Sequence, residues 1–263
     1  MRESLAGRRQ LSRAESPGTV LVTGASGRIG RVIVRECLDR GIDVIAVSRT
    51  SRAAVAPEQS AVGRLDWVQA DLLEPGGPEA VAVELDQRGF RPESIVHGAR
   101  NIADLTTPDH GEPSPANWTG EFRLAVVAAN DLVVRVARQC PDTLRSVVLL
   151  SSMYGIVAVN PNLYAHPANR PPVHYGVVRA AVIQLARELA VRLAPRVRVN
   201  AVSFGGVKGR VDSEFERRYA ALCPAGRMLR DEDLFGPIAF LMSRASSGTT
   251  GQNLIVDGGW TTW

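Results

Sequence analysis

Seven short apolar runs, rich in Val, Ile and Leu, alternate with segments of helical periodicity along almost the whole chain. A continuous apolar run is typical of a strand buried on both faces of a parallel sheet, whose strands need helical crossovers between them. The sequence therefore predicts an α/β fold: a single doubly wound parallel seven-stranded sheet with helices on both faces. The expected strands are 19–23, 42–48, 65–71, 94–99, 145–152, 197–204 and 253–259, and the expected helices are 31–40, 78–88, 118–139, 173–193 and 231–243.

A chain of 263 residues has the length of one large domain with a full hydrophobic core. We find no internal repeat and no stretch with the composition of a linker to a second domain, so residues 17–263 are expected to form this single domain. Residues 1–16 are polar and charged and are predicted to be a flexible N-terminal tail.

The composition excludes several classes of function. The net charge of +4 comes from thirty arginines and one lysine, Lys208, spread along the chain without a basic block, which argues against a nucleic-acid partner. No apolar run reaches eighteen residues, so no membrane span is expected. Cys37, Cys140 and Cys223 are odd in number and far apart, which predicts buried thiols in a reducing cytoplasm, and no metal-ligand spacing is present.

A glycine-rich turn lies between the first expected strand and its helix, with Gly24, Gly27 and Gly30 in the segment 23–30, named here the phosphate turn. Glycines at this spacing allow a tight turn, close approach of a pyrophosphate to the backbone, and close packing of helix on strand. The free N–H groups of the helix N-terminus then attract an anion. An ordinary strand–helix turn is the other interpretation, but the position in the first βα unit favours a dinucleotide cofactor.

The end of the second expected strand bears on which dinucleotide binds. An acidic residue there is typical of NAD-binding chains, because it contacts the ribose hydroxyls. Here the strand ends in Ser48-Arg49, which removes the repulsion of a 2′-phosphate and offers it a bidentate partner. The sequence therefore favours NADP (NADPH) over NAD, although a solvated loop arginine is the alternative.

Tyr175 is followed four residues later by Arg179 on the long expected helix, so both side chains share one face. A tyrosine and a lysine at this spacing form a known catalytic arrangement, in which the cation prepares the phenol for proton transfer. Arginine retains the positive charge but cannot pass on a proton.

The phosphate turn, the serine pair at 151–152 followed by Tyr154-Gly155, Tyr175, and the ending VDGGW at 256–260 together resemble the short-chain dehydrogenase/reductase family. The resemblance covers about residues 18–263 and is closest in detail to bacterial members of sugar and cell-surface polysaccharide pathways. It implies a Rossmann-like fold, a nicotinamide cofactor, and carbonyl–alcohol interconversion on a small-molecule substrate. It also implies a homodimer or homotetramer built partly through the two long central helices.

The resemblance assigns roles to individual residues. Ser152 matches the residue that polarises the substrate oxygen, Tyr175 matches the proton donor, and Arg179 stands at the position of the catalytic lysine. The expected cofactor-binding residues are Gly24, Ser26, Gly27, Arg28, Ile29, Gly30, Ser48, Arg49, Asp71, Leu72, Gly98, Ala99, Tyr175, Arg179, Gly205 and Val207.

Four places near this site depart from the family pattern. Besides Arg179, the segment 97–100 reads His-Gly-Ala-Arg instead of Asn-Asn-Ala-Gly, Ala125 occupies the position of a helical asparagine, and Phe204-Gly205 replaces Pro-Gly. Three interpretations stay open: conversion of a lysine in an arginine-rich chain, altered chemistry, or a fold kept for binding. The expected function is an oxidoreductase of a small polar substrate, such as a sugar derivative, with NADP(H); the alternative is a repurposed member, either a non-redox tailoring enzyme or a binding or structural partner.

Two further features have open interpretations. His97 follows the fourth expected strand, where α/β sites form, and is either a functional contact or a satisfied core residue. Segment 208–226 lies where the family has a lid over the substrate, and Arg210, Arg217 and Arg218 are either anion ligands or a solvated helix face.

Overall fold

The computed structural model describes residues 18–50, 62–105, 112–209 and 211–263. The predicted tail, residues 1–16, and Arg210 of the expected lid lie outside the described residues.

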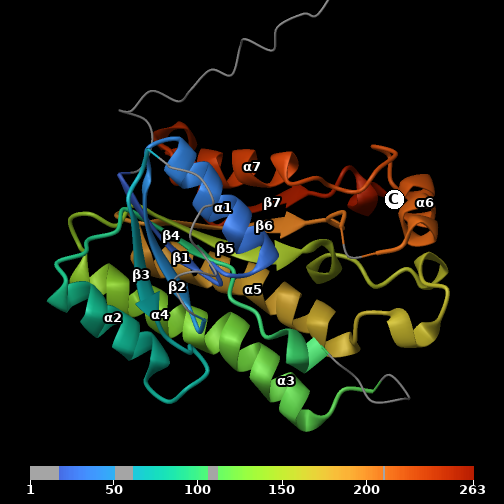
Figure 1. The fold of residues 1–263 in the computed structure, drawn as a ribbon, viewed down its shortest axis with the longest axis horizontal. Coiled ribbons are helices and arrows are strands. Elements are labelled where there is room, and N and C mark those ends of the chain that lie inside the picture. Colours follow the sequence, from blue (N-terminus) through green and yellow to red (C-terminus); the bar gives the residue numbers. More distant parts are fainter. Residues whose placement is uncertain (1–17, 51–61, 106–111, 210) are drawn as a thin grey trace, which may run out of the picture.

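Seven parallel strands form one sheet in the order β3-β2-β1-β4-β5-β6-β7 (Figure 1). The five inner strands are short and almost wholly buried, as the apolar runs predict, whereas the edge strands β3 and β7 are only partly buried. The α/β fold class is confirmed. Their bounds are β1 Thr19–Thr23, β2 Asp43–Ser48, β3 Leu65–Gln69, β4 Ser94–His97, β5 Ser146–Ser152, β6 Arg198–Phe204 and β7 Asn253–Val256.

Helices cover both faces of this sheet (Figure 1). On one face, α1 and α7 bury apolar side chains against β1, β2 and β6; on the other, α2, α4 and α5 pack against a second apolar layer. The helical bounds are α1 Arg28–Asp39, α2 Gly77–Gln87, α3 Pro115–Phe122, α4 Ala129–Gln139, α5 Val173–Leu193, α6 Ser213–Leu222 and α7 Glu232–Met242.

The helix expected over 118–139 begins earlier and is interrupted. Ser114 caps α3 in a reciprocal bond with Asn117, which places the start at Pro115. A π-helical segment, Arg123–Ala128, then joins α3 to α4 without a break in the chain direction. Such π-segments rotate the preceding turn relative to the following one, and here the turn before it carries Glu121, which is wholly buried.

A third apolar cluster lies beyond the carboxyl ends of β5 and β6 and contains the side chain of Tyr219 from α6. The Tyr219 ring stacks on Trp260 at 4.5 Å between centroids, and its hydroxyl accepts a bond of 2.9 Å from the Gly206 N–H. Helix α6 is therefore anchored to the loop after β6 and to the C-terminal turn. Trp260 is a core residue, with 5% of its surface exposed.

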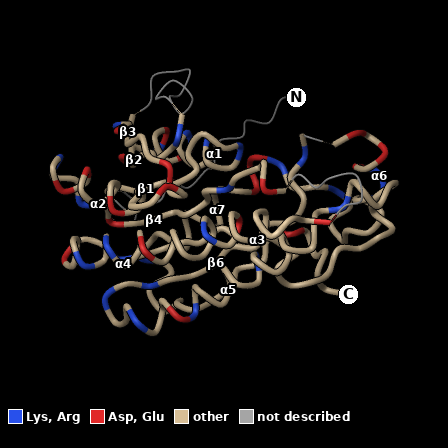
Figure 2. The backbone as a smooth tube through the Cα atoms, turned by 90° about the horizontal axis from the view of Figure 1, so that it is seen from below, with Lys and Arg blue, Asp and Glu red and all other residues tan. Residues whose placement is uncertain are grey.

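The charged residues are spread over the chain, and the cysteines are buried, as the sequence predicts. Figure 2 shows acidic and basic residues interspersed along the backbone, without a separate basic face among the described residues. All three cysteines are buried and free, and burial raises the pKa of the Cys37 thiol to about 12. Within the described ranges no helix is long and apolar enough to cross a membrane, and no cluster of three metal-binding side chains occurs there.

Candidate active site

The carboxyl ends of the strands open into one cleft of about 980 Å³. It lies where the chain turns from the β1–β3 half of the sheet to β4, the crevice in which doubly wound sheets bind ligands. Every residue predicted from the sequence for catalysis or cofactor binding lines this cleft. They are Gly24, Ser26, Gly27, Arg28, Ile29, Gly30, Ser48, Arg49, Asp71, Leu72, Gly98, Ala99, Ser152, Tyr175, Arg179, Gly205 and Val207.

The phosphate turn needs its glycines for steric reasons. Gly24 has a φ of 68°, and a Cβ there would lie 2.6 Å from the carbonyl oxygen of Gly98. A Cβ on Gly30 would lie 2.1 Å from the Gly24 oxygen, so helix α1 approaches the turn too closely for any side chain. These contacts are to backbone atoms that cannot move aside. The turn therefore presents bare backbone to the cleft.

The start of α1 fits a bound anion. Its N-cap, Gly27, contributes no side-chain bond, so the first-turn N–H groups have no capping partner and face the cleft. Arg31 adds positive charge there and donates to the Ser26 carbonyl oxygen. Together with the glycines, which leave room for a pyrophosphate, this arrangement fits a dinucleotide. Arg28 instead reaches across the cleft and pairs with Asp231 at 3.2 Å.

The end of the cleft beside β2 and β3 carries Ser48, Arg49 and Asp71. The Ser48 hydroxyl bonds the carbonyl oxygen of Thr50 at 3.0 Å and so lies within the turn after β2. Arg49 is half exposed and lies 3.8 Å from Asp71, a distance at which the ion pair is loose. The guanidinium is therefore free to take a different anion at small cost.

Ser152 and Tyr175 come from different elements that pack closely together. Ser152 ends β5, and the following turn, Met153–Gly155, lies against the backbone of α5. A Cβ on Gly155 would lie 2.7 Å from the carbonyl carbon of Arg179, so glycine permits this approach. Ser151 also donates a 2.8 Å bond to the Arg179 carbonyl oxygen. The strand end with Ser152 is thus fixed against the helix that carries Tyr175.

Arg179 is buried and is held by two acceptors. Its guanidinium donates to the carboxylate of Glu121 on α3 and, at 3.4 Å, to the carbonyl oxygen of Leu150. The side chains of Arg179 and Glu121 are 7% and 0% exposed. The same guanidinium lies 5.3 Å from the ring centroid of Tyr175. Arg179 therefore sits beside the predicted proton donor, but its charge is compensated by a buried carboxylate.

His97 is buried between the phosphate turn and this pair. Its Nδ1 lies 2.9 Å from the Thr23 hydroxyl, which also accepts a bond from the Gly98 N–H. Burial, and then the positive charge of Arg179, lower the pKa of His97 to about 4. The imidazole is neutral at physiological pH, fixes the β4 end next to Gly98 and does not line the cleft, which favours a core position over a functional contact. Its buried Nε2 has no hydrogen-bond partner among the described residues.

The reaction end of the cleft also carries Arg100, whose side chain is exposed. Its guanidinium lies 5.6 Å from the centroid of the Tyr175 ring, within the range of a cation–π contact. Arg100 therefore lies over the face of the predicted proton donor instead of filling a buried pocket. Tyr154 and Tyr164, whose hydroxyls lie 2.7 Å apart, line the cleft nearby.

Sequence reasoning missed Glu121 and Tyr219. Glu121 is a single glutamate in a helix, and no local signal separates a buried glutamate from a solvated one. Ala125, the position of the family asparagine, is buried in the π-helical segment and provides no polar atom beyond its backbone. For the expected lid, Arg217 is 76% exposed and pairs with Glu214, which fits the solvated helix face. Arg218 also pairs with Glu214 but is only 24% exposed and donates to the Leu163 carbonyl, so it has a structural contact instead.

Known proteins resemble this chain over almost its whole length. A family profile described as Enoyl-(Acyl carrier protein) reductase matches residues 24–261. An NADP-dependent mannitol dehydrogenase of Hypocrea jecorina is 34% identical, over 92% of this chain and 92% of the relative. A ribulose-forming D-arabinitol 2-dehydrogenase of Candida tropicalis is 27% identical, over 93% and 92% of the two chains.

The chain belongs to the short-chain dehydrogenase/reductase family. A solved short-chain dehydrogenase from Leptospira borgpetersenii with bound NAD+ superposes with a TM-score of 0.85, at 25% identity and 99% coverage of both chains. As a short-chain dehydrogenase/reductase with a Rossmann-like sheet, the protein is an NAD(P)-dependent oxidoreductase that interconverts carbonyl and alcohol groups. The expected family, fold and enzyme class are confirmed.

Proposed function

We propose that the protein oxidises an alcohol or reduces a carbonyl on a small polar, sugar-like substrate with NADP(H). The observation that carries this proposal is the single cleft that joins the phosphate turn to Ser152 and Tyr175. The names of the relatives, a mannitol and an arabinitol dehydrogenase, support a polyhydroxylated substrate.

A bound nicotinamide dinucleotide supplies or accepts the hydride. The chain's own residues then manage the charge and the proton on the substrate oxygen. Ser152 donates a hydrogen bond to that oxygen, where negative charge develops during reduction. The Tyr175 hydroxyl gives its proton to the oxygen during reduction and removes one during oxidation. Arg179 contributes charge and position but no proton transfer, because a guanidinium keeps its protons at neutral pH.

The remaining predicted residues are proposed as contacts of the dinucleotide. The α1 N-terminus with Gly24, Ser26, Gly27 and Gly30 receives the pyrophosphate, and Asp71 and Leu72 flank the adenine. Gly98, Ala99, Gly205 and Val207 line the path toward the reaction end, with Arg28 and Ile29 at its edge.

The preference for NADP rests on Arg49. Its ion pair with Asp71 is loose and half exposed, so a 2′-phosphate can replace the carboxylate as its partner. Titration of the protein with NADPH and with NADH, followed by fluorescence, tests the preference. We expect Arg49→Gln to weaken NADPH binding by roughly 10-fold, as for one charged hydrogen-bonding partner, and to leave NADH binding unchanged. Equal loss for both cofactors would remove Arg49 as the selecting residue.

Turnover of a panel of polyols and their carbonyl forms tests the reaction itself. Tight NADPH binding together with turnover of any panel member supports the oxidoreductase. No binding of either cofactor would instead support the alternative of a repurposed fold without hydride transfer.

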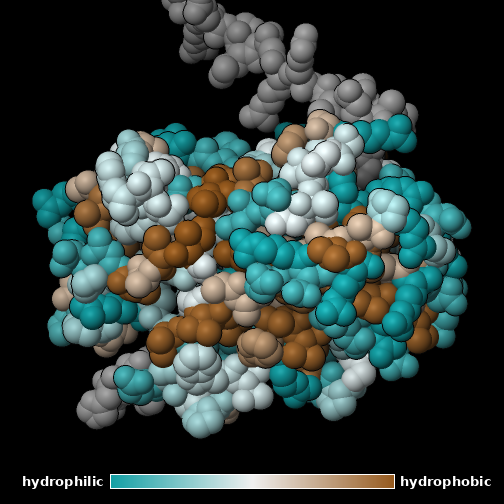
Figure 3. Space-filling view, turned by 180° about the vertical axis from the view of Figure 1, so that it is seen from behind, coloured by the Kyte–Doolittle hydropathy of each residue, from teal (hydrophilic) through white to brown (hydrophobic). Residues whose placement is uncertain are grey.

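We also propose that the protein is a cytoplasmic homodimer or homotetramer assembled through α3 and α5. These helices expose apolar side chains, since Phe122, Val173 and Val177 are between 44% and 60% exposed. Figure 3, a view from behind, shows apolar side chains gathered in bands between hydrophilic ones. The three buried thiols support a reducing compartment. Sedimentation analysis of the wild type and of Val177→Asp tests the assembly, and a monomeric wild type would contradict it.

A further inference from the structure

The charged side chains that line the cleft are strongly unbalanced. Among the described residues they are one carboxylate, Asp71, and six arginines: Arg28, Arg31, Arg49, Arg100, Arg170 and Arg179. Arg28, Arg49 and Arg179 each pair with a carboxylate, namely Asp231, Asp71 and Glu121. The other three arginines have no carboxylate partner among the described residues.

These three cations lie at two different places. Arg31 lies on the first turn of α1, beside the phosphate turn, where a pyrophosphate would meet it. Arg100 follows β4, and Arg170 lies just before α5, so both belong to the reaction end near Tyr175. Neither has a carboxylate partner among the described residues, and both side chains are exposed.

Arg100 has the position that matters most for the substrate. Its guanidinium lies 5.6 Å from the Tyr175 ring centroid, so a substrate oxygen that bonds the Tyr175 hydroxyl brings its neighbouring carbons within reach of Arg100. A guanidinium binds planar carboxylates and phosphate groups through two parallel N–H bonds. A neutral polyol would leave both positive charges at this end without a counter-ion.

We propose that the substrate carries an anionic group, a carboxylate or a phosphate, close to the reacting carbon, and that Arg100 binds this group with Arg170 at the outer rim. The proposal rests on the proposed function and narrows its substrate class. Arg179 is unsuited to the same task, because its side chain is only 7% exposed and its charge is already paired with the Glu121 carboxylate.

The test uses matched sets of five- and six-carbon polyols, the corresponding aldonic acids and the corresponding polyol phosphates, each with NADP+. We expect the wild type to favour the acids or the phosphates over the neutral polyols by at least about 10-fold in kcat/KM, and to lose this preference as salt increases. Which of the two anionic sets is favoured identifies the group.

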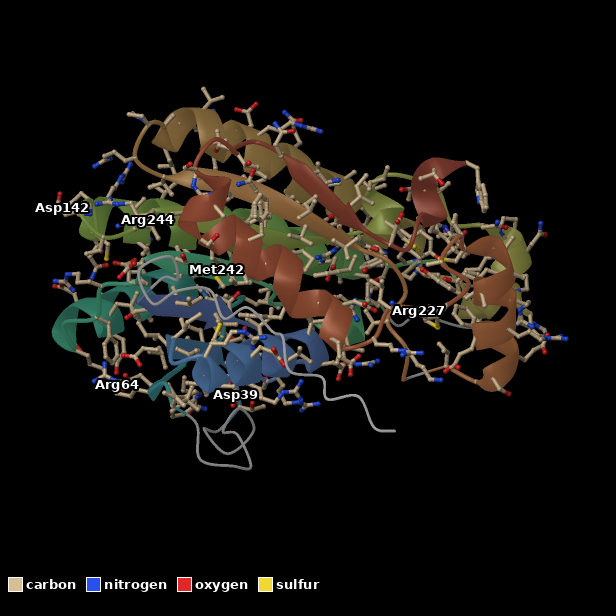
Figure 4. The ribbon with its side chains drawn as sticks, turned by 90° about the horizontal axis from the view of Figure 1, so that it is seen from above. Asp39, Arg64, Asp142, Arg227, Met242 and Arg244 are labelled. Atoms are coloured by element: carbon tan, nitrogen blue, oxygen red, sulfur yellow. The ribbon has the colours of Figure 1, made fainter. Side chains whose placement is uncertain are left out.

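Variants then assign the preference to a residue. Arg100→Gln is expected to raise KM for the anionic substrate by roughly 10- to 100-fold and to leave KM for the neutral polyol nearly unchanged. Arg100→Lys should retain part of the preference, and Arg170→Gln should lose less than Arg100→Gln. Arg244→Gln is the matched control, because it removes the same charge from an exposed arginine that does not line the cleft. Arg244 is labelled in Figure 4.

A binding measurement separates this inference from the reaction. Calorimetry of the same three ligand sets is performed on the complex with NADPH. Anion binding that disappears in Arg100→Gln supports the inference, even where no compound is turned over. The absence of turnover would instead refute the proposed sugar-like substrate. Equal binding of polyols and anions, or an equal loss of both in Arg100→Gln, overturns the inference.

Discussion

Removal of the Glu121 carboxylate tests the most unusual feature of the site, the buried ion pair with Arg179. In Glu121→Ala the guanidinium stays in a place where its side chain is only 7% exposed, with the Leu150 carbonyl as its remaining partner. Breaking a buried pair by removal of one member costs about 3–5 kcal/mol, because the remaining charge is uncompensated. This is a large part of a total stability of about 5–15 kcal/mol.

The loss is measured by urea denaturation and by thermal unfolding, both followed by circular dichroism at a fixed protein concentration. For a domain of this size, each kcal/mol corresponds to about 2–4 °C in Tm, so Glu121→Ala should lower Tm by roughly 6–20 °C. Arg179→Met should cost a similar amount, because it leaves the wholly buried Glu121 unpaired. The double variant Glu121→Leu/Arg179→Met removes both charges and should lie within about 2 kcal/mol of the wild type.

The matched control is the exposed pair of Glu188 and Arg192 on α5, whose side chains are 55% and 70% exposed at 3.4 Å. Glu188→Ala is expected to cost no more than about 0.5 kcal/mol. If Glu121→Ala costs as little as this control, or if the two single losses simply add in the double variant, the assignment of a coupled buried pair is wrong.

The remaining predictions concern catalysis, the phosphate turn and pH. Tyr175→Phe and Ser152→Ala should each lower kcat/KM by about 10²–10⁴, with urea midpoints close to that of the wild type. Gly30→Ala should abolish cofactor binding in a fluorescence titration, since its Cβ would lie 2.1 Å from a carbonyl oxygen; the control Gly248→Ala, whose added Cβ meets nothing within 4 Å beyond its chain neighbours, should bind the cofactor as the wild type does. The pKa of His97 is lowered from 6.5 to about 4, so the unfolded chain binds a proton that the folded chain excludes. Stability is therefore fully present above pH 6.5 and should fall as pH drops from 6.5 to 4, by on the order of 3 kcal/mol; urea curves at several pH values should show a smaller fall in His97→Gln.

The strands and the phosphate turn could be predicted because their signals are local. A run such as 145–152 is apolar at nearly every position, and only a strand with both faces covered needs that pattern. The glycines of the phosphate turn are required by backbone contacts within the turn and with the adjacent strand end. Family resemblance then placed Ser152 and Tyr175 in one cleft, as the structure has them.

The partner of Arg179 could not be predicted because it depends on the packing of distant segments. Glu121 and Arg179 are 58 residues apart, and the π-helical segment after α3 changes which side chains of that helix face α5. A regular helical periodicity does not contain this rotation. The anchoring of α6 by Tyr219 and Trp260 likewise joins two segments whose contact no sequence pattern indicates.

The buried pair also bears on why arginine stands at position 179. Conversion of a lysine in an arginine-rich chain explains a change at one position, but it does not explain a wholly buried carboxylate beside it. A carboxylate at 0% exposure is strongly disfavoured unless a cation with good geometry compensates it. Arginine supplies two directed donors, one for Glu121 and one for the Leu150 carbonyl, where the single ammonium of lysine has no such fork. Glu121 and Arg179 therefore form one physical unit. The pair compensates the charge at the lysine position and leaves Arg100, 5.6 Å from the Tyr175 ring centroid, as a cation beside the predicted proton donor with no carboxylate partner among the described residues.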